Sequence, residues 1–243
     1  MSWLKRFKHE IRENLGRSPD GVAFVSRFAH WREELVREDS AICIEGYPRS
    51  ANTFSVAALL VSQPGFEGHI ARHTHLCGQV LRAVRFGVPT LVVIREPIAA
   101  ACSLRIFAPW MTAKQCLRDY HRFYSGIAPA ASDLALLRFE DITGDYNHAI
   151  DALNRKFDMG LAPYGADKDT EDRCFEMVED MDRKFRGDAD VSEASVARPS
   201  AERERAKQEV ASEMDAPELA SLRASCTELY EKLQQSCEPG GDA

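Results

Sequence analysis

Residues 47–54, YPRSANTF, combine one arginine, one asparagine and three hydroxyl groups within eight positions. They follow the apolar run AICIEG, which is typical of a buried strand, and they lead into NTFSVAALLVSQ, which has the composition of a helix. A strand that turns directly into a helix points backbone N–H groups and the positive end of the helix dipole at one spot. The stretch therefore predicts an anion site with Arg49 as its cation. The structural alternative is a plain strand–helix turn with a solvated arginine.

The segment from Gly46 to Thr53 has the length of the phosphate-binding P-loop, G-x-x-x-x-G-K-[ST], but it departs from that template at two positions. Ala51 stands in place of the second glycine and Asn52 in place of the lysine, whereas Thr53 keeps the hydroxyl. In nucleotide triphosphatases the lysine contacts the β- and γ-phosphates. We expect this loop to bind an anionic phosphate while being poorly equipped to hydrolyse a triphosphate.

Two later segments carry further polar residues at strand ends. In VVIREPIAAACSL, Arg95 ends an apolar strand and Ser103 follows eight residues later. The carboxyl edge of a parallel sheet is where α/β proteins bind ligands, and a guanidinium with a hydroxyl suits a doubly charged phosphate. A structural ion pair of Arg95 with Glu96 or Glu140 is the alternative. In LLRFEDITGD, Phe139 ends a strand, and the acids that follow are expected to cap a helix rather than to do chemistry.

In order and spacing, these three segments resemble the sulfotransferases that use 3′-phosphoadenosine 5′-phosphosulfate (PAPS), whose loop commonly reads Y-P-[KR]-S-G-[TN]-T-[WF]. The resemblance covers residues 41–158. It implies that the 5′-phosphosulfate is bound by the backbone N–H groups of Ser50, Ala51, Asn52 and Thr53 and by the Ser50 and Thr53 hydroxyls, with Arg49 at the bridging oxygen. It also implies that Arg95 and Ser103 bind the 3′-phosphate and that Phe54 and Phe139 pack near the adenine.

Sulfuryl transfer also needs a base for the acceptor proton, and a group that titrates near neutrality favours histidine. The segment RHTHLC looks like the K-T-H-L-P segment of the same family, whose histidine is the general base. This resemblance implies that His75 is the base, and it places His73 where relatives have a lysine and Cys77 where they have proline. Glu67 is the alternative base, because carbohydrate-directed relatives often use a glutamate. A histidine hydrogen-bonded in the core is the structural alternative for His75.

The function implied by the resemblance is metal-free, in-line transfer of a sulfuryl group from PAPS to a small metabolite, glycolipid or saccharide, with Arg49 and His75 as catalytic residues. The alternatives are a P-loop kinase or phosphotransferase and a non-catalytic nucleotide-binding protein of the same fold. No zinc site is expected, because the seven cysteines show no CxxC or CxxH spacing; we expect them to be buried reduced thiols.

Strands alternating with helices predict an α/β protein of three layers, with a central, mostly parallel sheet and a P-loop-like strand–loop–helix unit. Apolar spacing predicts helices over 2–16 and 22–38, and strands over 68–76 and 133–141. Two further helices are predicted at the C-terminal end, over 200–214 and 216–236.

The chain is expected to form a single domain. N-terminal helices occupy 1–40, a nucleotide-binding core 41–158, and a lid region with C-terminal helices 159–243. By the resemblance, the lid should bring basic side chains over the 3′-phosphate, and its candidates are Lys184, Arg186 and Arg198.

Charge and hydropathy restrict the kinds of partner and the location that we expect. A net charge of −7 argues against binding nucleic acid, which needs a basic face. No apolar run approaches the ~20 residues that span a bilayer, and no apolar signal core follows the N-terminus, so we expect a cytoplasmic protein. The basic residues of the helix over 2–16 leave open a peripheral contact with a membrane surface, although a helix docked on the domain is the simpler interpretation. No pattern indicates the oligomeric state.

Overall fold

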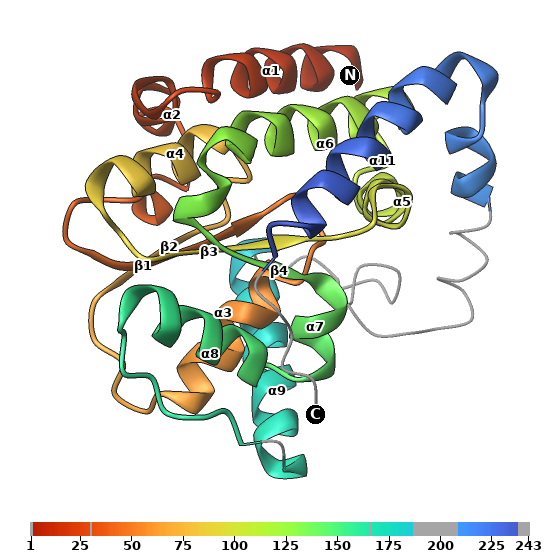
Figure 1. Cartoon of the computed structure of the whole chain (residues 1–243). Coiled ribbons are helices and arrows are strands. Elements are labelled where there is room, and N and C mark those ends of the chain that lie inside the picture. Colours follow the sequence, from red (N-terminus) through yellow and green to blue (C-terminus); the bar gives the residue numbers. More distant parts are fainter. Residues whose placement is uncertain (1, 30, 166, 187–208, 238–243) are drawn as a thin grey trace.

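A four-stranded, all-parallel sheet lies between two layers of helices (Figure 1). The computed structural model describes residues 2–29, 31–165, 167–186 and 209–237. The strands are β1 (Ser40–Gly46), β2 (His69–Arg72), β3 (Thr90–Ile94) and β4 (Ala135–Arg138), in the order β2-β1-β3-β4. The predicted three-layer α/β architecture with a parallel sheet is confirmed.

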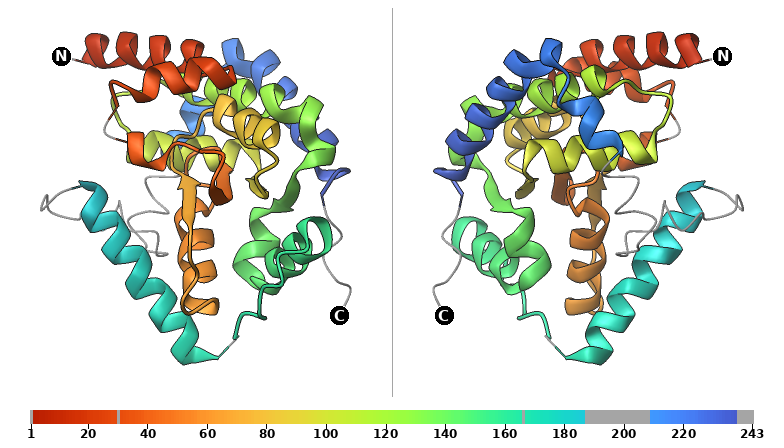
Figure 2. Two further views of the ribbon diagram at one scale, coloured as in Figure 1. Left: turned by 90° about the vertical axis from the view of Figure 1, so that its left-hand side faces the viewer. Right: turned by 90° about the vertical axis from the view of Figure 1, so that its right-hand side faces the viewer.

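The helices divide between the two faces of the sheet, as the side views also show (Figure 2). One layer holds α1 (Ser2–Leu15), α2 (Pro19–Ser26), α4 (Cys77–Phe86), α5 (Pro97–Phe107), α6 (Ala113–Ile127) and α11 (Ala220–Gln234). The other holds α3 (Asn52–Ser62), α7 (Phe139–Gly144), α8 (Asn147–Phe157) and α9 (Lys168–Arg186). Short 3₁₀ turns cover Arg32–Glu34, Ala128–Asp133 and Pro217–Leu219.

Each face of the sheet builds its own core. Successive side chains of a strand point to opposite faces, so Val92 and Ile94 of β3 pack with α5 and α6, whereas Leu91 and Val93 pack with α3 and α8. Because helices cover both faces, β3 is buried along its whole length. This explains why its sequence is a continuous apolar run instead of an alternating one.

The strand order creates a topological switch beside β1. From β2 the chain crosses over β1 to enter β3, so α3, which follows β1, and α5, which follows β3, lie on opposite faces of the sheet (Figure 1). Gly46 at the end of β1 pairs with Val93 near the end of β3. The loops that leave these two strands therefore diverge at one edge, and the place between them, called the crevice below, is where open α/β sheets usually bind ligands.

The prediction of a helix over 22–38 is wrong for the second half of that range. Ser18 caps α2, its hydroxyl accepting from the Gly21 N–H at 3.0 Å, and the helix ends at Ser26. Turns follow in which N–H groups donate to carbonyl oxygens three residues earlier. They bring Trp31 into a buried cluster with Val22 and Leu76. This burial overrides the helical spacing of the apolar residues.

Two predicted strands are shorter than expected. The strand over 68–76 ends at Arg72, because His73 and His75 adopt left-handed backbone conformations with φ of 58° and 53°. The strand over 133–141 ends at Arg138, where α7 begins. The Asp141 carboxylate accepts from the backbone N–H of Arg138 at 3.3 Å, so Asp141 caps this helix as predicted, and Glu140 lies beside it in the first turn.

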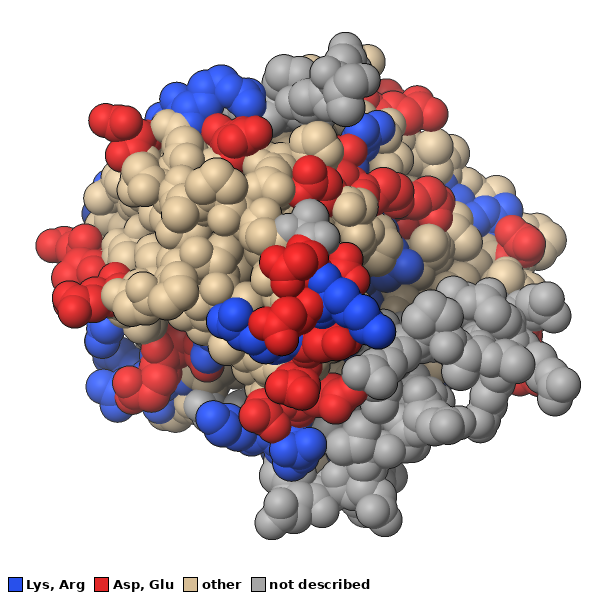
Figure 3. All heavy atoms as spheres, turned by 90° about the horizontal axis from the view of Figure 1, so that it is seen from below, with Lys and Arg blue, Asp and Glu red and all other residues tan. Residues whose placement is uncertain are grey.

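The region after residue 160 holds one helix that the sequence analysis did not identify. This helix, α9, packs against α3 and pairs charges along its own surface, with Arg183 lying 2.7 Å from Asp180. Acidic and basic side chains alternate on the face that includes α9 (Figure 3). Further on, residues 209–214 are helical and α11 follows, which agrees with the two predicted C-terminal helices over the part that is described.

All seven cysteines are free thiols, and six of them are buried. Among the helices described, none combines the length and the apolar character that crossing a membrane requires.

We expect Gly46→Ala to destabilise the fold by about 1–3 kcal/mol, because overpacking forces a backbone shift. A Cβ at this position would lie 2.6 Å from the carbonyl oxygen of Val93 and 2.7 Å from Oδ1 of Asn52. The matched control is Gly144→Ala, where an added Cβ meets nothing within 4 Å. Urea unfolding of both variants makes the comparison, and equal stability of the two would contradict this view of the β1–β3 junction.

Candidate functional site

The loop between β1 and α3 has the backbone of an anion site. Arg49 and Ala51 adopt left-handed conformations, with φ of 71° and 62°. Such a conformation costs a non-glycine residue about 1–2 kcal/mol, and it turns successive N–H groups towards a common centre. α3 begins at Asn52, directly after the loop, so the N–H groups of its first turn point the same way. The P-loop-like unit predicted here is present.

Asn52 supports this loop from within. Its buried side chain donates to the carbonyl oxygens of Gly46 at 3.3 Å and Tyr47 at 3.1 Å. The P-loop lysine would reach outward from this position, whereas the asparagine holds the loop to the end of β1. Asn52 can therefore offer a phosphate its backbone N–H but not its side chain.

Two arginines from separate segments meet at the crevice. Arg95, just after β3, donates to the carbonyl oxygen of Arg49 at 2.6 Å, and its guanidinium lies 4.0 Å from the ring centroid of Phe139. Arg49 donates through Nε to the Ser103 hydroxyl of α5 at 3.4 Å and stacks on Phe107 at 5.1 Å. Two positive charges and a hydroxyl are thus brought to one edge of the sheet, an arrangement that suits an anion with more than one negative charge.

Two buried tyrosines of α6 hold the strand ends that carry these arginines. The Tyr120 hydroxyl donates to the carbonyl oxygen of Arg95 at 2.7 Å, and the Tyr124 hydroxyl donates to that of Val93 at 2.7 Å. The Tyr124 hydroxyl also accepts from the N–H of Tyr47 at 3.3 Å. The α6 layer therefore fixes the ends of β1 and β3 relative to each other. No local pattern in the sequence indicates these contacts.

His75 is fixed in one tautomer by the backbone. Its Nδ1 lies 2.9 Å from the carbonyl oxygen of Gly46, which can only accept, so Nδ1 carries the proton and Nε2 keeps a lone pair. Burial lowers the pKa of His75 to about 4; the Gly46 contact opposes this shift, and the charges of Arg12 and Arg49 add to it. At neutral pH the side chain, 23% exposed, is an uncharged base.

Glu45 positions His75 and was missed by the sequence analysis. Its carboxylate is wholly buried in β1 and accepts from the N–H of Thr74 at 2.8 Å, the Thr74 hydroxyl at 2.9 Å and the N–H of His75 at 3.1 Å. Burial raises the pKa of Glu45 to about 7, against the effect of these hydrogen bonds. The signal for it was present, since an acid in the middle of the run AICIEG needs partners in the core.

The remaining residues that the resemblance singled out lie around this centre. Thr53 contacts His73, with 3.2 Å between Oγ1 and Nε2, and burial lowers the pKa of His73 to about 3. Phe54 packs on the α3 side of the sheet against Tyr146. Ser50 is fully buried in the loop.

The structure does not bring Glu67 to the site. It is exposed and lies two residues before β2, at the amino edge of the sheet, opposite to the loop that holds Arg49.

The lid candidates fall at the end of α9 and beyond it. Lys184 is exposed on α9, and Arg186 is the last residue of that helix. Arg198 lies outside the described residues. A different basic side chain lies beside His75, and it was not singled out from the sequence. Arg12 of α1 donates to the carbonyl oxygen of Thr74, the residue before His75.

No family model matches this chain, and a search of curated proteins finds no match either. Among solved structures, the chain is similar to mouse sulfotransferase SULT7A1 complexed with PAP, at 11% sequence identity and a TM-score of 0.41. The alignment covers 79% of this chain and 91% of that one. At so distant a level of similarity, the function proposed below rests on the residues of the site and not on this neighbour.

We predict that the stability difference between the wild type and Glu45→Gln depends on pH. A carboxyl whose pKa rises from 4.5 to about 7 on folding binds its proton more tightly in the native state. Its contribution to stability is therefore complete below pH 4.5 and is lost as the pH rises through 7, by about 3 kcal/mol. The wild type should lose that amount relative to the variant over this range. Urea unfolding at several pH values measures it, and a constant difference would contradict a buried, titrating Glu45.

Proposed function

We propose that this protein is a PAPS-dependent sulfotransferase. The observation that carries the proposal is the contact of Arg49 with Ser103, two residues 54 positions apart that belong to separate segments of the resemblance. The hydrogen bond from Arg95 to the Arg49 carbonyl joins the same two segments. A chance resemblance of short motifs would give no reason for their polar side chains to meet at a topological switch point.

In this proposal the crevice binds the donor at both of its phosphate ends. The backbone N–H groups of residues 50–53, with the hydroxyls of Ser50 and Thr53, bind the 5′-phosphosulfate at the start of α3. Arg95 and Ser103 bind the 3′-phosphate, and Phe54 and Phe139 pack near the adenine. The stacking of Arg95 on Phe139 favours a guanidinium held in a fixed orientation, as bidentate recognition requires.

The reaction would be an in-line displacement at sulfur. The acceptor oxygen forms a bond to sulfur while the bond between sulfur and the bridging oxygen of the 5′-phosphate breaks, and the electron pair of that bond goes to the phosphate. Nε2 of His75 takes the acceptor proton, and Arg49 stabilises the charge that grows on the leaving oxygen. The products are the sulfated acceptor and adenosine 3′,5′-bisphosphate. The donor arrives already activated, so the step needs no metal ion.

His75 is uncharged at neutral pH, but its pKa of about 4 makes it a weaker base than the group titrating near neutrality that was expected. A base that is uncharged at all pH values above about 4 is ready to accept a proton, and the negative charge of a bound donor raises its basicity. The Nδ1 contact with Gly46 persists through the reaction, because the carbonyl also stabilises the imidazolium that forms. We assign the acceptor to a small metabolite, a glycolipid or a saccharide.

Calorimetry with adenosine 3′,5′-bisphosphate, AMP and ATP tests the proposal. We expect the bisphosphate to bind at least tenfold more tightly than either of the others. A preference for ATP would favour a P-loop kinase or phosphotransferase. Tight binding of the bisphosphate, with no transfer from labelled PAPS to any of a panel of hydroxyl and amine acceptors, would favour a non-catalytic nucleotide-binding protein.

We predict that Arg95→Ala removes the preference for a 3′-phosphate. Loss of a charge-assisted bidentate contact should weaken bisphosphate binding by about 2–3 kcal/mol while leaving AMP binding nearly unchanged. Arg138→Ala is the matched control, because Arg138 pairs with Ile94 in register at the end of the neighbouring strand but binds Asp141. Calorimetry with both ligands measures the selectivity, and unchanged selectivity in Arg95→Ala would remove this residue from the site.

We predict that the imidazole of His75 in the free protein stays uncharged from pH 8 down to about pH 5, where an ordinary imidazole would already be largely protonated, and NMR titration of its ring protons measures this. The base form of His75 is lost only as the pH falls towards about 4. His75→Asn keeps a side-chain donor near Gly46 but lacks the lone pair of Nε2. It should abolish transfer while retaining bisphosphate affinity, and an active His75→Asn enzyme would show that another group is the base.

A further inference from the structure

An ordinary surface helix buries its apolar stripe and exposes its charges. The N-terminal helix α1 does the reverse. Its apolar residues are exposed, with Trp3 at 69% and Phe7 at 57%, and the same stripe includes Leu4, Ile11 and Leu15. Nine large apolar side chains are exposed in the part of the chain that is described, and seven of them lie within residues 3–28. The predicted amphipathic helix is therefore docked on the protein, but by its polar face.

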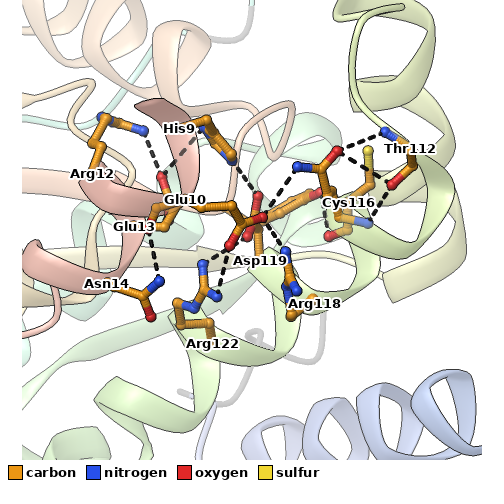
Figure 4. Close-up of polar contacts among 12 residues, drawn as sticks. His9, Glu10, Arg12, Glu13, Asn14, Thr112, Cys116, Arg118, Asp119 and Arg122 are labelled. Atoms are coloured by element: carbon orange, nitrogen blue, oxygen red, sulfur yellow. Dashed lines mark hydrogen bonds and ion pairs between the residues drawn. The ribbon is translucent and has the colours of Figure 1, made fainter. Parts of the chain in front are cut away.

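Ion pairs and hydrogen bonds to α6 hold that polar face (Figure 4). His9 lies 2.5 Å from Asp119, and Glu10 contacts both Arg118 and Arg122. Gln115 donates to Glu10 at 3.1 Å. These contacts fix the orientation of α1 and therefore keep the apolar stripe turned outward.

Further polar contacts hold α1 against the loops that follow α5 and β2. Arg6 donates to the carbonyl oxygen of Trp110 at 2.6 Å, and Arg12 donates to that of Thr74. The exposed stripe is thus a fixed feature of the folded protein and not a helix that packs by its apolar face elsewhere on the domain.

The charges around the stripe are positive, although the whole chain is acidic. Six basic and three acidic residues lie within residues 1–28, against a net charge of −7 for the chain. Two of those three acids, Glu10 and Glu13, are turned inward to partners. Lys5 and Lys8 of α1 are exposed, as are Arg17 and Arg27 further along the chain.

We propose that α1 docks this protein on an anionic phospholipid bilayer. A helix that combines tryptophan, phenylalanine and leucine on one side with flanking lysines is suited to lie in the plane of a membrane interface. Trp3 and Phe7 enter the boundary between headgroups and acyl chains, and Lys5 and Lys8 contact the lipid phosphates. The proposal does not depend on the sulfotransferase reaction, because it uses residues outside the crevice.

A second copy of the chain is the less suitable occupant. A twofold contact through this face would bring the exposed cations of one copy against those of the other, and like charges placed together oppose association. An anionic surface is complementary to both the charge and the apolar character of the helix.

Co-sedimentation of the full chain with vesicles tests the proposal. We expect binding to phosphatidylcholine vesicles that contain phosphatidylglycerol, and much weaker binding to phosphatidylcholine alone. The double variant Trp3→Ser, Phe7→Ser should lose at least tenfold in vesicle affinity. The control Phe175→Ser removes a partly exposed aromatic residue from α9, in the helix layer on the other face of the sheet, and should bind like the wild type.

Charge variants test the lipid headgroup separately. Lys5→Gln with Lys8→Gln should lose about fivefold in affinity per lysine for the anionic vesicles, whereas Lys168→Gln at the start of α9 should lose nothing. Unfolding midpoints and bisphosphate affinity should be unchanged in every variant of α1, so a failure here is distinguishable from a failure of the proposed function. Equal binding by the wild type and the Trp3, Phe7 variant would overturn the proposal. So would a dimer in sedimentation velocity that this variant abolishes, in a protein that binds no vesicles.

Discussion

The buried carboxylate of Glu45 is the interaction on which the organisation of the crevice depends. Moving an acid into a core is unfavourable unless hydrogen bonds surround it, and here Thr74 and His75 supply them from a segment 29 or 30 residues further along the chain. Those bonds hold the chain in a left-handed turn just after β2 and place the imidazole of His75 against the carbonyl oxygen of Gly46. One residue of the central strand thus determines where the imidazole of His75 lies relative to the loop between β1 and α3.

Much of the fold followed from local pattern. The continuous apolar run of β3 and the glycine–tyrosine–proline end of β1 identified two central strands, because burial on both faces leaves a mark in the sequence itself. The loop residues Arg49 and Thr53 were also recognisable from local pattern, because the backbone geometry of the loop is set by near neighbours in the sequence. The resemblance added Arg95 and Ser103, and the structure brings these segments together.

Other features depended on contacts that no local pattern contains. The extra length predicted for α2 came from apolar residues at helical spacing, yet Trp31 is buried with a residue more than forty positions away, Leu76. The helix α9 was missed for the opposite reason. Its residues Met177, Val178 and Met181 pack against the core at helical spacing, but the many acids around them hide this pattern. The partners of Glu45 and the contact of Arg12 with Thr74 are of the same kind, because tertiary packing alone brings them together.

The left-handed residues around the crevice have a consequence for how this protein can evolve. Arg49, Ala51, His73 and His75 all hold backbone conformations that glycine adopts without strain. At Ala51 a glycine would relieve that strain and remove only a methyl group, whereas at Arg49 and His75 the same relief would also delete the side chain. A laboratory lineage selected only for heat resistance should therefore drift to glycine at these sites and give up the crevice as it does so.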